Sequence, residues 1–342
     1  MKILITGGAG YIGSHTIIKI IESTSWNVIS ADNYINSTSN AFKRIKKITD
    51  REIKNYEIDL CDFKETKKIF SENPDITGVI HFAALKSVPE SVANPDLYYK
   101  NNNESLNTIL SCVKEFNVRN LIFSSSCSVY GNINTLPVNE MTPLQKANSP
   151  YGDTKQQGEK IIENFSVMNP QINFISLRYF NPVGAHMSGL IGDDPKRKCD
   201  ALMPGITETA IGISDEFVIH GTDYKTRDGS CIRDYIHVSD IANAHVLALK
   251  YLSDNQNGTN YDVFNLGFGN GISVLEAIQA FEKVSGKRLK CKNGPRRAGD
   301  VEAIYSDSTK AKKILKWSPK YKIEQMMESA WKWEQNKHLK LI

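Results

Sequence analysis

Short apolar runs alternate with helical patterns through the first half of the chain. Most of these runs are rich in Ile, Leu, Val and Phe and end in polar or glycine-containing segments, as buried strands do. The stretches between them carry apolar residues at helical spacing. We therefore expect strands at residues 2–6, 26–31, 55–59, 78–82, 121–124 and 174–178, and helices near 14–21, 39–49, 62–72, 96–117 and 151–168.

This βα alternation predicts an α/β fold with a doubly wound parallel sheet of the Rossmann type. Beyond about residue 181 the pattern is irregular, and the expected domains are a Rossmann domain at 1–181 and a smaller α/β domain at 182–342. Segments such as 233–255 are expected to pack back on the first domain. The irregular part has turn-rich stretches at 184–200 and 221–230 and helical patterns near 238–253, 273–285 and 322–337.

Three glycines, Gly7, Gly10 and Gly13, follow the first strand where the next helix begins. Glycines there permit a tight turn and let backbone N–H groups approach a pyrophosphate, although a glycine-rich turn can also be only a turn. Asp32 ends the second strand, nineteen residues beyond Gly13. A carboxylate in this place can be a solvated loop residue, or it can bind ribose hydroxyls and repel a 2′-phosphate. The turn and Asp32 together predict NAD as cofactor.

Polar segments also follow the later strands. Asp59 and Leu60 follow the third strand, residues 83–86 (AALK) the fourth, 124–128 (SSSCS) the fifth and 179–182 (YFNP) the sixth. Because the carboxyl ends of parallel strands meet at one edge of a sheet, we expect these segments to face one crevice. The serine side chains after a strand can also simply hydrogen-bond backbone groups of their own turn, without a role in function.

Tyr151 and Lys155 lie four residues apart, directly after Ser149 and Pro150. If a helix begins at Pro150, both side chains lie on one helix face. A phenol titrates near pH ~10, so it serves as a base near neutrality only beside a cation, which Lys155 would supply. The same spacing occurs on many surface helices. The catalytic interpretation of the pair therefore depends on the predicted cofactor turn upstream.

Composition excludes several other classes of protein. The 342 residues are 40% apolar, enough for about two domains with a sizeable core. The net charge is +4 and no basic block is present, so we expect no nucleic-acid partner. The chain has no run of eighteen apolar residues, and its six cysteines lack metal-ligand spacing. We expect a soluble cytoplasmic protein with no signal peptide, membrane span or metal.

The chain resembles a known family. The glycine turn, Asp32, the serine cluster and the Tyr151-x-x-x-Lys155 pair are similar to those of the extended short-chain dehydrogenase/reductase superfamily. Within it, the chain resembles the UDP-glucose 4-epimerases essentially from end to end. The motifs that carry this resemblance are ILITGGAGYIG (3–13), RYFNPVGAH (178–186), RDYIHV (233–238) and RRAGD (296–300).

The resemblance implies a reaction. Tyr151, as phenolate, takes the proton of the sugar 4-hydroxyl while a hydride passes from C4 to the nicotinamide. Ser126 bonds the same oxygen, and Lys155 lowers the pKa of the phenol. The 4-keto sugar then turns over and regains the hydride on its opposite face, so that UDP-glucose and UDP-galactose interconvert while NAD stays bound. The N-acetylated UDP-sugars are further candidate substrates.

The resemblance also implies ligand contacts and a homodimer formed through the helices near 96–117 and 151–168. The arginines of the RRAGD motif can be solvated, or their guanidinium groups can hold phosphates. The NAD contacts are Gly7, Gly10, Tyr11, Ile12, Gly13, Asp32, Asn33, Asn36, Ser37, Asp59, Leu60, Phe82, Ala83, Lys86, Asn101, Ser124, Tyr151, Lys155 and Tyr179. The UDP-sugar contacts are Lys86, Ser126, Asn181, Asp200, Ala201, Leu202, Val218, His220, Arg233, Arg297, Asp300 and Ile304.

The chain departs from the family at three positions. Ala84 stands where the family usually has Gly, and Ala201, preceded by Asp200, stands where an Asn usually contacts the substrate. The loss of that amide leaves this contact open. Ile304 stands at a position near the sugar that is often Tyr or a small residue. Because Ile is shorter than Tyr but stiff, we expect a pocket of intermediate size that favours UDP-glucose and UDP-galactose over the N-acetylated sugars.

Two other functions fit the same scaffold. Nucleotide-sugar 4,6-dehydratases share the fold and cofactor, but they place an Asp-Glu pair where this chain has residues 127–129 (CSV). Removal of the proton at C5 therefore has no evident agent. A non-catalytic NAD-binding regulator is the second alternative, because a fold does not determine a function. Such proteins typically lose the Tyr or the Lys, and both are present here.

Overall fold

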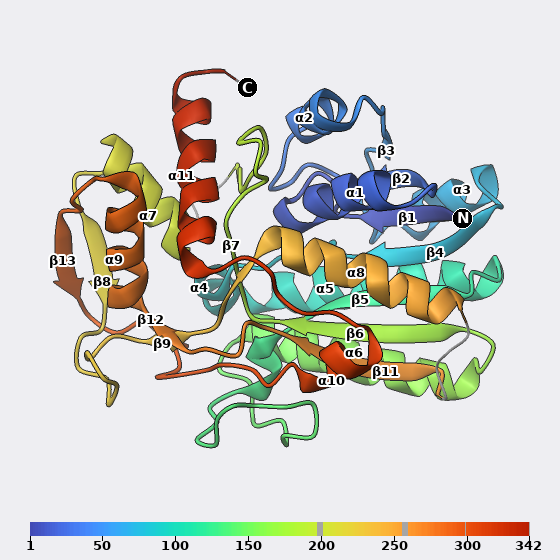
Figure 1. Cartoon of the computed structure of the whole chain (residues 1–342). Coiled ribbons are helices and arrows are strands. Elements are labelled where there is room, and N and C mark those ends of the chain that lie inside the picture. Colours follow the sequence, from blue (N-terminus) through green and yellow to red (C-terminus); the bar gives the residue numbers. More distant parts are fainter. Residues whose placement is uncertain (197–200, 255–258, 298, 342) are drawn as a thin grey trace.

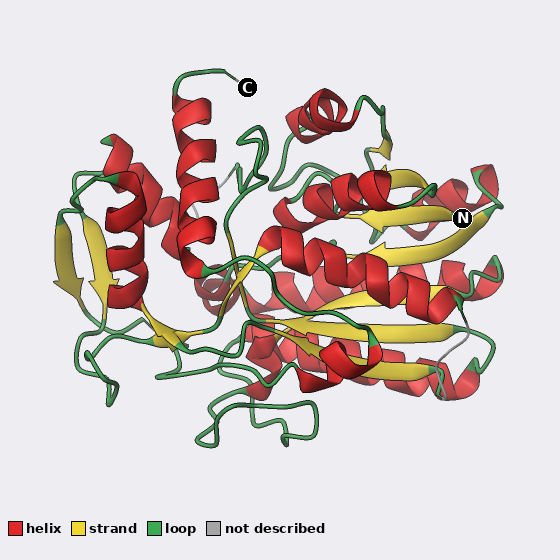
Figure 2. Ribbon diagram, in the orientation of Figure 1, coloured by secondary structure: helices red, strands yellow, loops and turns green. Residues whose placement is uncertain are grey.

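A seven-stranded sheet forms the larger part of the molecule, shown as a computed structural model in Figures 1 and 2. Its strands are β1 (Lys2–Thr6), β2 (Asn27–Ala31), β3 (Lys54–Tyr56), β4 (Ile76–His81), β5 (Asn120–Ser126), β6 (Asn173–Tyr179) and β11 (Tyr261–Leu266). They lie in the order β11-β6-β5-β4-β1-β2-β3, and all neighbours are parallel. The predicted doubly wound fold is confirmed. The structure describes residues 1–196, 201–254, 259–297 and 299–341.

Helices cover both faces of this sheet (Figure 2). Side chains alternate along a strand, so Ile3 and Ile5 pack on one face and Leu4 on the other. Both faces are therefore apolar, which explains why the strands are continuous apolar runs in the sequence. The first face is covered by α1 (Tyr11–Ser23) and α8 (Val238–Ser253), and the second by α3 (Phe63–Glu72), α5 (Pro95–Glu115) and α6 (Pro150–Met168).

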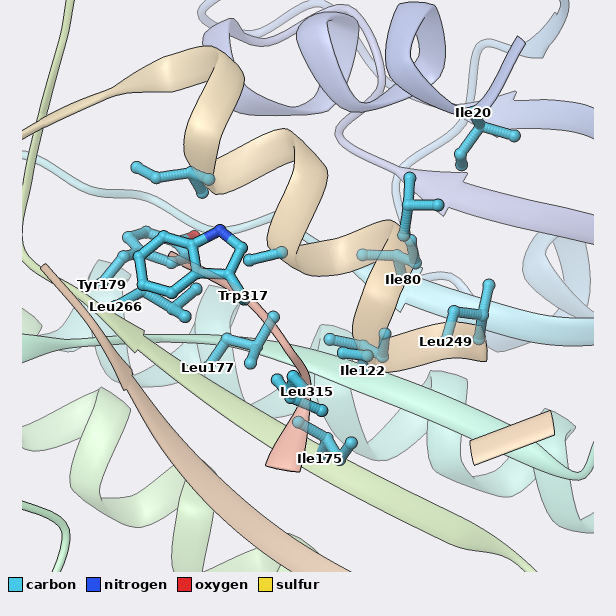
Figure 3. Packing of buried hydrophobic residues seen from close by; sticks show 14 of the residues in the cluster. Ile20, Ile80, Ile122, Ile175, Leu177, Tyr179, Leu249, Leu266, Leu315 and Trp317 are labelled. Atoms are coloured by element: carbon cyan, nitrogen blue, oxygen red, sulfur yellow. The ribbon is translucent and has the colours of Figure 1, made fainter. Parts of the chain in front are cut away.

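A tryptophan from the C-terminal half closes the core on the first face (Figure 3). Ile122 of β5 and Ile175 of β6 are fully buried and belong to one cluster with Leu249 of α8 and Trp317. The indole Nε1 of Trp317 donates a hydrogen bond to the backbone oxygen of Asp240 at 2.9 Å, which satisfies its polar atom. The chain near residue 317 is thereby fixed to the N-terminal sheet.

Two elements of the C-terminal half thus belong to the Rossmann unit. α8 packs on the first face of the sheet. β11 pairs with β6 over its whole length and adds a seventh strand that the sequence pattern did not indicate. The domain boundary at 181 stays a prediction, and the chain crosses between the two units more than once.

The rest of the chain forms a smaller unit with its own core. Ile206, Phe281, Met327 and Trp331 are among the residues that this core buries. The unit contains α7 (Leu202–Ile211), β8 (Phe217–His220), α9 (Val274–Ser285), β13 (Cys291–Gly294) and α11 (Ile323–His338). The remaining elements are α2 (Asn40–Thr49), α4 (Val88–Ala93), η1 (Cys127–Tyr130), β7 (Asn181–Val183), β9 (Ile232–Arg233), β10 (Tyr235–His237), β12 (Ile272–Ser273) and α10 (Thr309–Ile314).

The described residues contain neither a candidate membrane-spanning helix nor a candidate metal site. None of their helices is both long and apolar enough to cross a membrane. They also contain no group of three or more His, Cys, Asp or Glu side chains that could hold a metal ion.

Candidate active site

A cavity of about 460 Å³ opens along the carboxyl ends of the sheet strands. Its lining includes residues that directly follow β1, β2, β4, β5 and β6, as expected for an open α/β sheet. Every residue expected to contact NAD lines this cavity. Of the residues expected to contact the UDP-sugar, those that line it are Lys86, Ser126, Asn181, Arg233, Asp300 and Ile304.

The other residues of the predicted sugar set are not part of this lining. Ala201 is exposed directly before α7, and Leu202 packs into the core of the smaller unit. Val218 and His220 lie on β8. Asp200 lies outside the described residues. A role for these residues in substrate binding stays a prediction.

The glycine turn is shaped by close backbone packing. Gly7 has a φ of +70°, and its carbonyl oxygen accepts a hydrogen bond from Gly10 N at 3.1 Å. A Cβ atom on Gly13 would lie 2.2 Å from that oxygen, and one on Gly7 would lie 2.9 Å from Ala83 N. Only glycine fits at these two positions, because such separations are far shorter than van der Waals contact. The turn therefore presents bare backbone and the N-terminus of α1 to the cavity, as a pyrophosphate requires.

Asp32 ties the loop after β2 to this turn. Its Oδ2 accepts a hydrogen bond from Ala9 N at 3.0 Å, and its Oδ1 accepts bonds from Tyr34 N and Ser37 Oγ, both at 2.9 Å. A carboxylate has about four acceptor sites, so one remains for a ligand. These three bonds hold the carboxylate at the cavity wall, where ribose hydroxyls of a dinucleotide would meet it.

Tyr151 and Lys155 lie together at the first turns of α6. Ser149 caps this helix by accepting a hydrogen bond from Gly152 N at 3.1 Å, and Pro150 takes the first helical position. The Lys155 Nζ lies 5.9 Å from the Tyr151 ring centre and donates to the Ser124 backbone oxygen at 2.8 Å. The predicted helix start and the predicted juxtaposition are both present.

Burial disfavours the charged forms of both side chains. It raises the pKa of Tyr151 to about 12, and the hydrogen bond with Ser126 opposes this shift. Burial lowers the pKa of Lys155 to about 8, and the negative charge of Glu159 opposes that shift. Lys155 therefore keeps its positive charge at neutral pH, next to a phenol that needs a cation to ionise.

A buried ion pair anchors α6 behind the tyrosine and lysine. Glu159 accepts hydrogen bonds from Arg178 Nε at 2.8 Å and Nη2 at 2.6 Å, and a third from the Ser125 hydroxyl. Arg178 also donates to the Tyr130 hydroxyl at 3.1 Å. From the sequence, Arg178 is recognisable only as the start of a motif, and Glu159 was not predicted, although its four-residue spacing from Lys155 places both on one helix face.

Charged residues from the C-terminal half close the opposite side of the cavity. Asp300 lies between two arginines, with Arg233 Nη2 and Arg297 Nε each 3.3 Å from one of its oxygens. Arg233 and Asp300 line the cavity, whereas Arg297 is not among the lining residues. Arg296 pairs with Asp223 at 2.8 Å and stacks on the Tyr224 ring. This side therefore offers guanidinium groups to an anionic ligand through Arg233 and, next to it, Arg297.

Ile304 and Ala84 also line the cavity. Ile304 is buried and packs in a small cluster with Val129, Tyr130 and Phe180. Its aliphatic side chain thus forms part of the cavity wall. Lining residues that sequence reasoning missed include Arg44 and the segment 191–195, which carry no local motif of their own.

Comparisons with known proteins identify the family. The family model described as "GDP-mannose 4,6 dehydratase" matches residues 4–330. The chain is 43% identical to the UDP-glucose 4-epimerase of Bacillus subtilis, covering 98% of this chain and 97% of that protein.

Solved structures agree with this match. The UDP-glucose 4-epimerase of Bifidobacterium longum, in complex with NAD+ and UDP, is 42% identical with a TM-score of 0.95, covering 99% of both chains. The UDP-Glc/GlcNAc 4-epimerase of Campylobacter jejuni is 39% identical with a TM-score of 0.83, covering 98% of this chain and 99% of that one. Full-length identity of this size, on the same fold, means that the chain belongs to the UDP-glucose 4-epimerase family.

Proposed function

We propose that this chain interconverts UDP-glucose and UDP-galactose by inverting C4 through a 4-keto intermediate, with NAD held in the cavity. The observation that carries this proposal is the meeting of the glycine turn, Asp32 and the Tyr151–Lys155 pair in one cavity. A dinucleotide in this cavity could accept a hydride while the Tyr151 phenol, next to the Lys155 cation, accepts a proton. The membership of the epimerase family supports the same reaction.

In this proposal Tyr151 takes the proton of the sugar 4-hydroxyl and later returns it to the 4-keto oxygen. The Ser126 hydroxyl, which bonds Tyr151, lies where it can orient that oxygen. Bound NAD supplies the hydride acceptor and a positive charge, and this charge adds to that of Lys155 in stabilising the phenolate. Arg233 and Arg297 hold the diphosphate, which must stay bound while the sugar turns over.

A product assay tests the proposal. The purified protein is incubated with UDP-galactose, and the expected product is UDP-glucose of unchanged mass, with no net formation of NADH. A product lighter by one water would show a 4,6-dehydratase instead. Bound NAD without any turnover of UDP-sugars would favour the non-catalytic regulator.

We also propose that the protein is a homodimer that pairs through α5 and α6. These helices lie side by side on the second face of the sheet, where Asn103 Nδ2 donates to Gln157 Oε1 at 2.7 Å. Apolar Leu97, Val167 and Met168 are exposed on them. Native mass spectrometry should show a complex with twice the chain mass of 38.4 kDa and with NAD bound to it.

We propose in addition that the protein is located in the cytoplasm. The cysteines of the described residues are all free thiols, which supports a reducing compartment.

A further inference from the structure

The segment 191–196, here named the strap, rises between α2 and α11 (Figure 1). Residues 191–195 line the cavity together with the loop 32–38 and with Ala41 and Arg44 of α2. The strap therefore forms one wall of the half of the cavity that contains Asp32, where the adenosine part of NAD is expected.

Hydrogen bonds fasten the strap to the N-terminal side of the cavity. Asp194 Oδ2 accepts from Arg44 Nη1 at 2.7 Å. Lys196 Nζ donates to the Tyr34 backbone oxygen at 2.7 Å, and Lys196 N donates to Asn36 O at 3.4 Å. The strap thus lies directly over the loop that follows β2.

The same strap is fastened to the C-terminal helix. Asp194 Oδ1 lies 3.0 Å from Lys337 Nζ of α11. Trp333, one turn earlier on that helix, donates from Nε1 to the Asp193 backbone oxygen at 3.3 Å, and its ring lies 4.8 Å from the Arg44 guanidinium carbon. One carboxylate therefore bridges two helices that come from opposite ends of the chain.

The bridge is partly shielded from solvent. The side chains of Arg44, Asp194 and Lys337 are 12%, 26% and 38% exposed. Burial alone would raise the pKa of Asp194, but Arg44 and Lys337 outweigh it and hold this pKa below its usual range. Partly buried ion pairs are screened less by salt than exposed ones, so this bridge holds the strap more firmly than a surface contact would.

We infer that Asp194, by bridging Arg44 and Lys337, latches the strap over the cavity and slows the release of NAD. This inference rests on the NAD site proposed above. The reaction returns to the sugar the same hydride that it removed, so loss of the reduced cofactor in mid-cycle would carry that hydride away and leave an oxidised sugar behind. The contacts that hold the latch, to α2, to α11 and to the loop after β2, include neither Tyr151 nor Lys155, so the latch can retain NAD without obstructing the sugar.

The test measures the release of NAD directly. Holoprotein carrying isotope-labelled NAD is mixed with excess unlabelled NAD, and the loss of label is followed by gel filtration. We expect release to accelerate about tenfold in Asp194→Asn and about threefold to fivefold in Lys337→Met, as losses of two and one partly exposed ion pairs. The double variant should release NAD no faster than Asp194→Asn, because Asp194→Asn has already removed the ion pair through which Lys337 fastens the strap.

Lys283→Met is the matched control, because it removes an ion pair of 3.9 Å with Glu324 at the other end of α11. Its release rate should equal that of the wild type. Wild-type rates in Asp194→Asn or in Lys337→Met would overturn the latch. Lys337 does not line the cavity, so its variant remains informative if Asp194→Asn fails to fold. A wild-type protein that holds no NAD at all would instead overturn the proposed cofactor site.

Discussion

At the scale of single residues, the site depends on a phenol whose ionisation burial opposes. Tyr151→Phe removes the hydroxyl but keeps the ring that lines the cavity. We expect kcat to fall by about 10²–10⁴-fold, because proton transfer at the sugar oxygen loses its agent. The NAD content should stay unchanged, since the turn and Asp32 hold the cofactor. Near-normal kcat in a fully loaded variant would exclude Tyr151 as the base, and cofactor content by mass spectrometry is the control.

Ile304 is the residue whose size should tune the choice of sugar. The wild type is expected to turn over UDP-glucose and UDP-galactose better than their N-acetylated counterparts. Ile304→Tyr should widen that preference by about 10–100-fold in kcat/KM, because a larger wall excludes an N-acetyl group. Ile304→Val, which widens the cavity, should shift the ratio the other way. An unchanged ratio in both variants would show that another residue sets the specificity.

The residues of the cavity were largely predictable, since they follow strands whose apolar runs are plain in the sequence. The residues that were missed act through long-range pairs. Arg44 and Asp194 are 150 positions apart, and neither lies in a motif with a local signature. Only the folded chain brings them together.

At the scale of elements, the buried pair of Glu159 and Arg178 fixes α6 to the sheet. Glu159→Gln leaves the Arg178 charge buried without its partner, so we expect a loss of about 3–5 kcal/mol in the free energy of unfolding. Replacing both residues, Glu159→Gln with Arg178→Met, should recover part of that loss, because no unpaired charge remains. Urea unfolding of the single and double variants measures both effects.

An exposed ion pair on the same helix provides the matched control. Lys160 and Glu163 lie 2.8 Å apart, and both side chains are more than half exposed. Glu163→Gln should cost at most about 1 kcal/mol. An equal loss in Glu159→Gln and Glu163→Gln would mean that the buried pair does not anchor the helix.

Elements with strong local signals were predicted closely, and the others were not. α6 begins at Pro150 behind a serine cap, both of which are visible in the sequence. β11 contains Asp262 and Asn265, and α7 contains Pro204 and Gly205, which weaken any local strand or helix signal. The Asn265 side chain accepts a bond from the Tyr130 hydroxyl at 2.6 Å, so its place in a buried strand depends on a distant partner.

At the scale of the whole molecule, four buried histidines link folding to pH. Burial lowers the pKa of His15 and His81 to about 3 and that of His237 and His245 to about 4. The unfolded chain binds these protons near pH 6.5, so the folded state loses stability as the pH falls from 6.5 towards 4. Each histidine contributes up to ~1.4 kcal/mol per pH unit.

Urea unfolding between pH 7.5 and pH 5 measures this dependence. His245→Phe keeps a ring beside Phe82 and Tyr179 but removes one titrating group, so the slope should decrease by about one proton. His338 is exposed near the end of α11, and His338→Gln should leave the slope unchanged. Stability that is constant down to pH 5 would contradict the buried neutral histidines.

The late position of β11 in the chain has a consequence for synthesis. β6 emerges from the ribosome long before β11, and until β11 pairs with it the outer edge of β6 has no partner strand. Translation at ~5–20 residues per second leaves this edge open for roughly 4–17 seconds. α8 and Trp317, which cover the first face of the sheet, also follow β6 in the chain. The nascent protein therefore passes through an interval with an open strand edge and an apolar face that only α1 and its neighbours cover, and we expect it to depend most on chaperones in this interval.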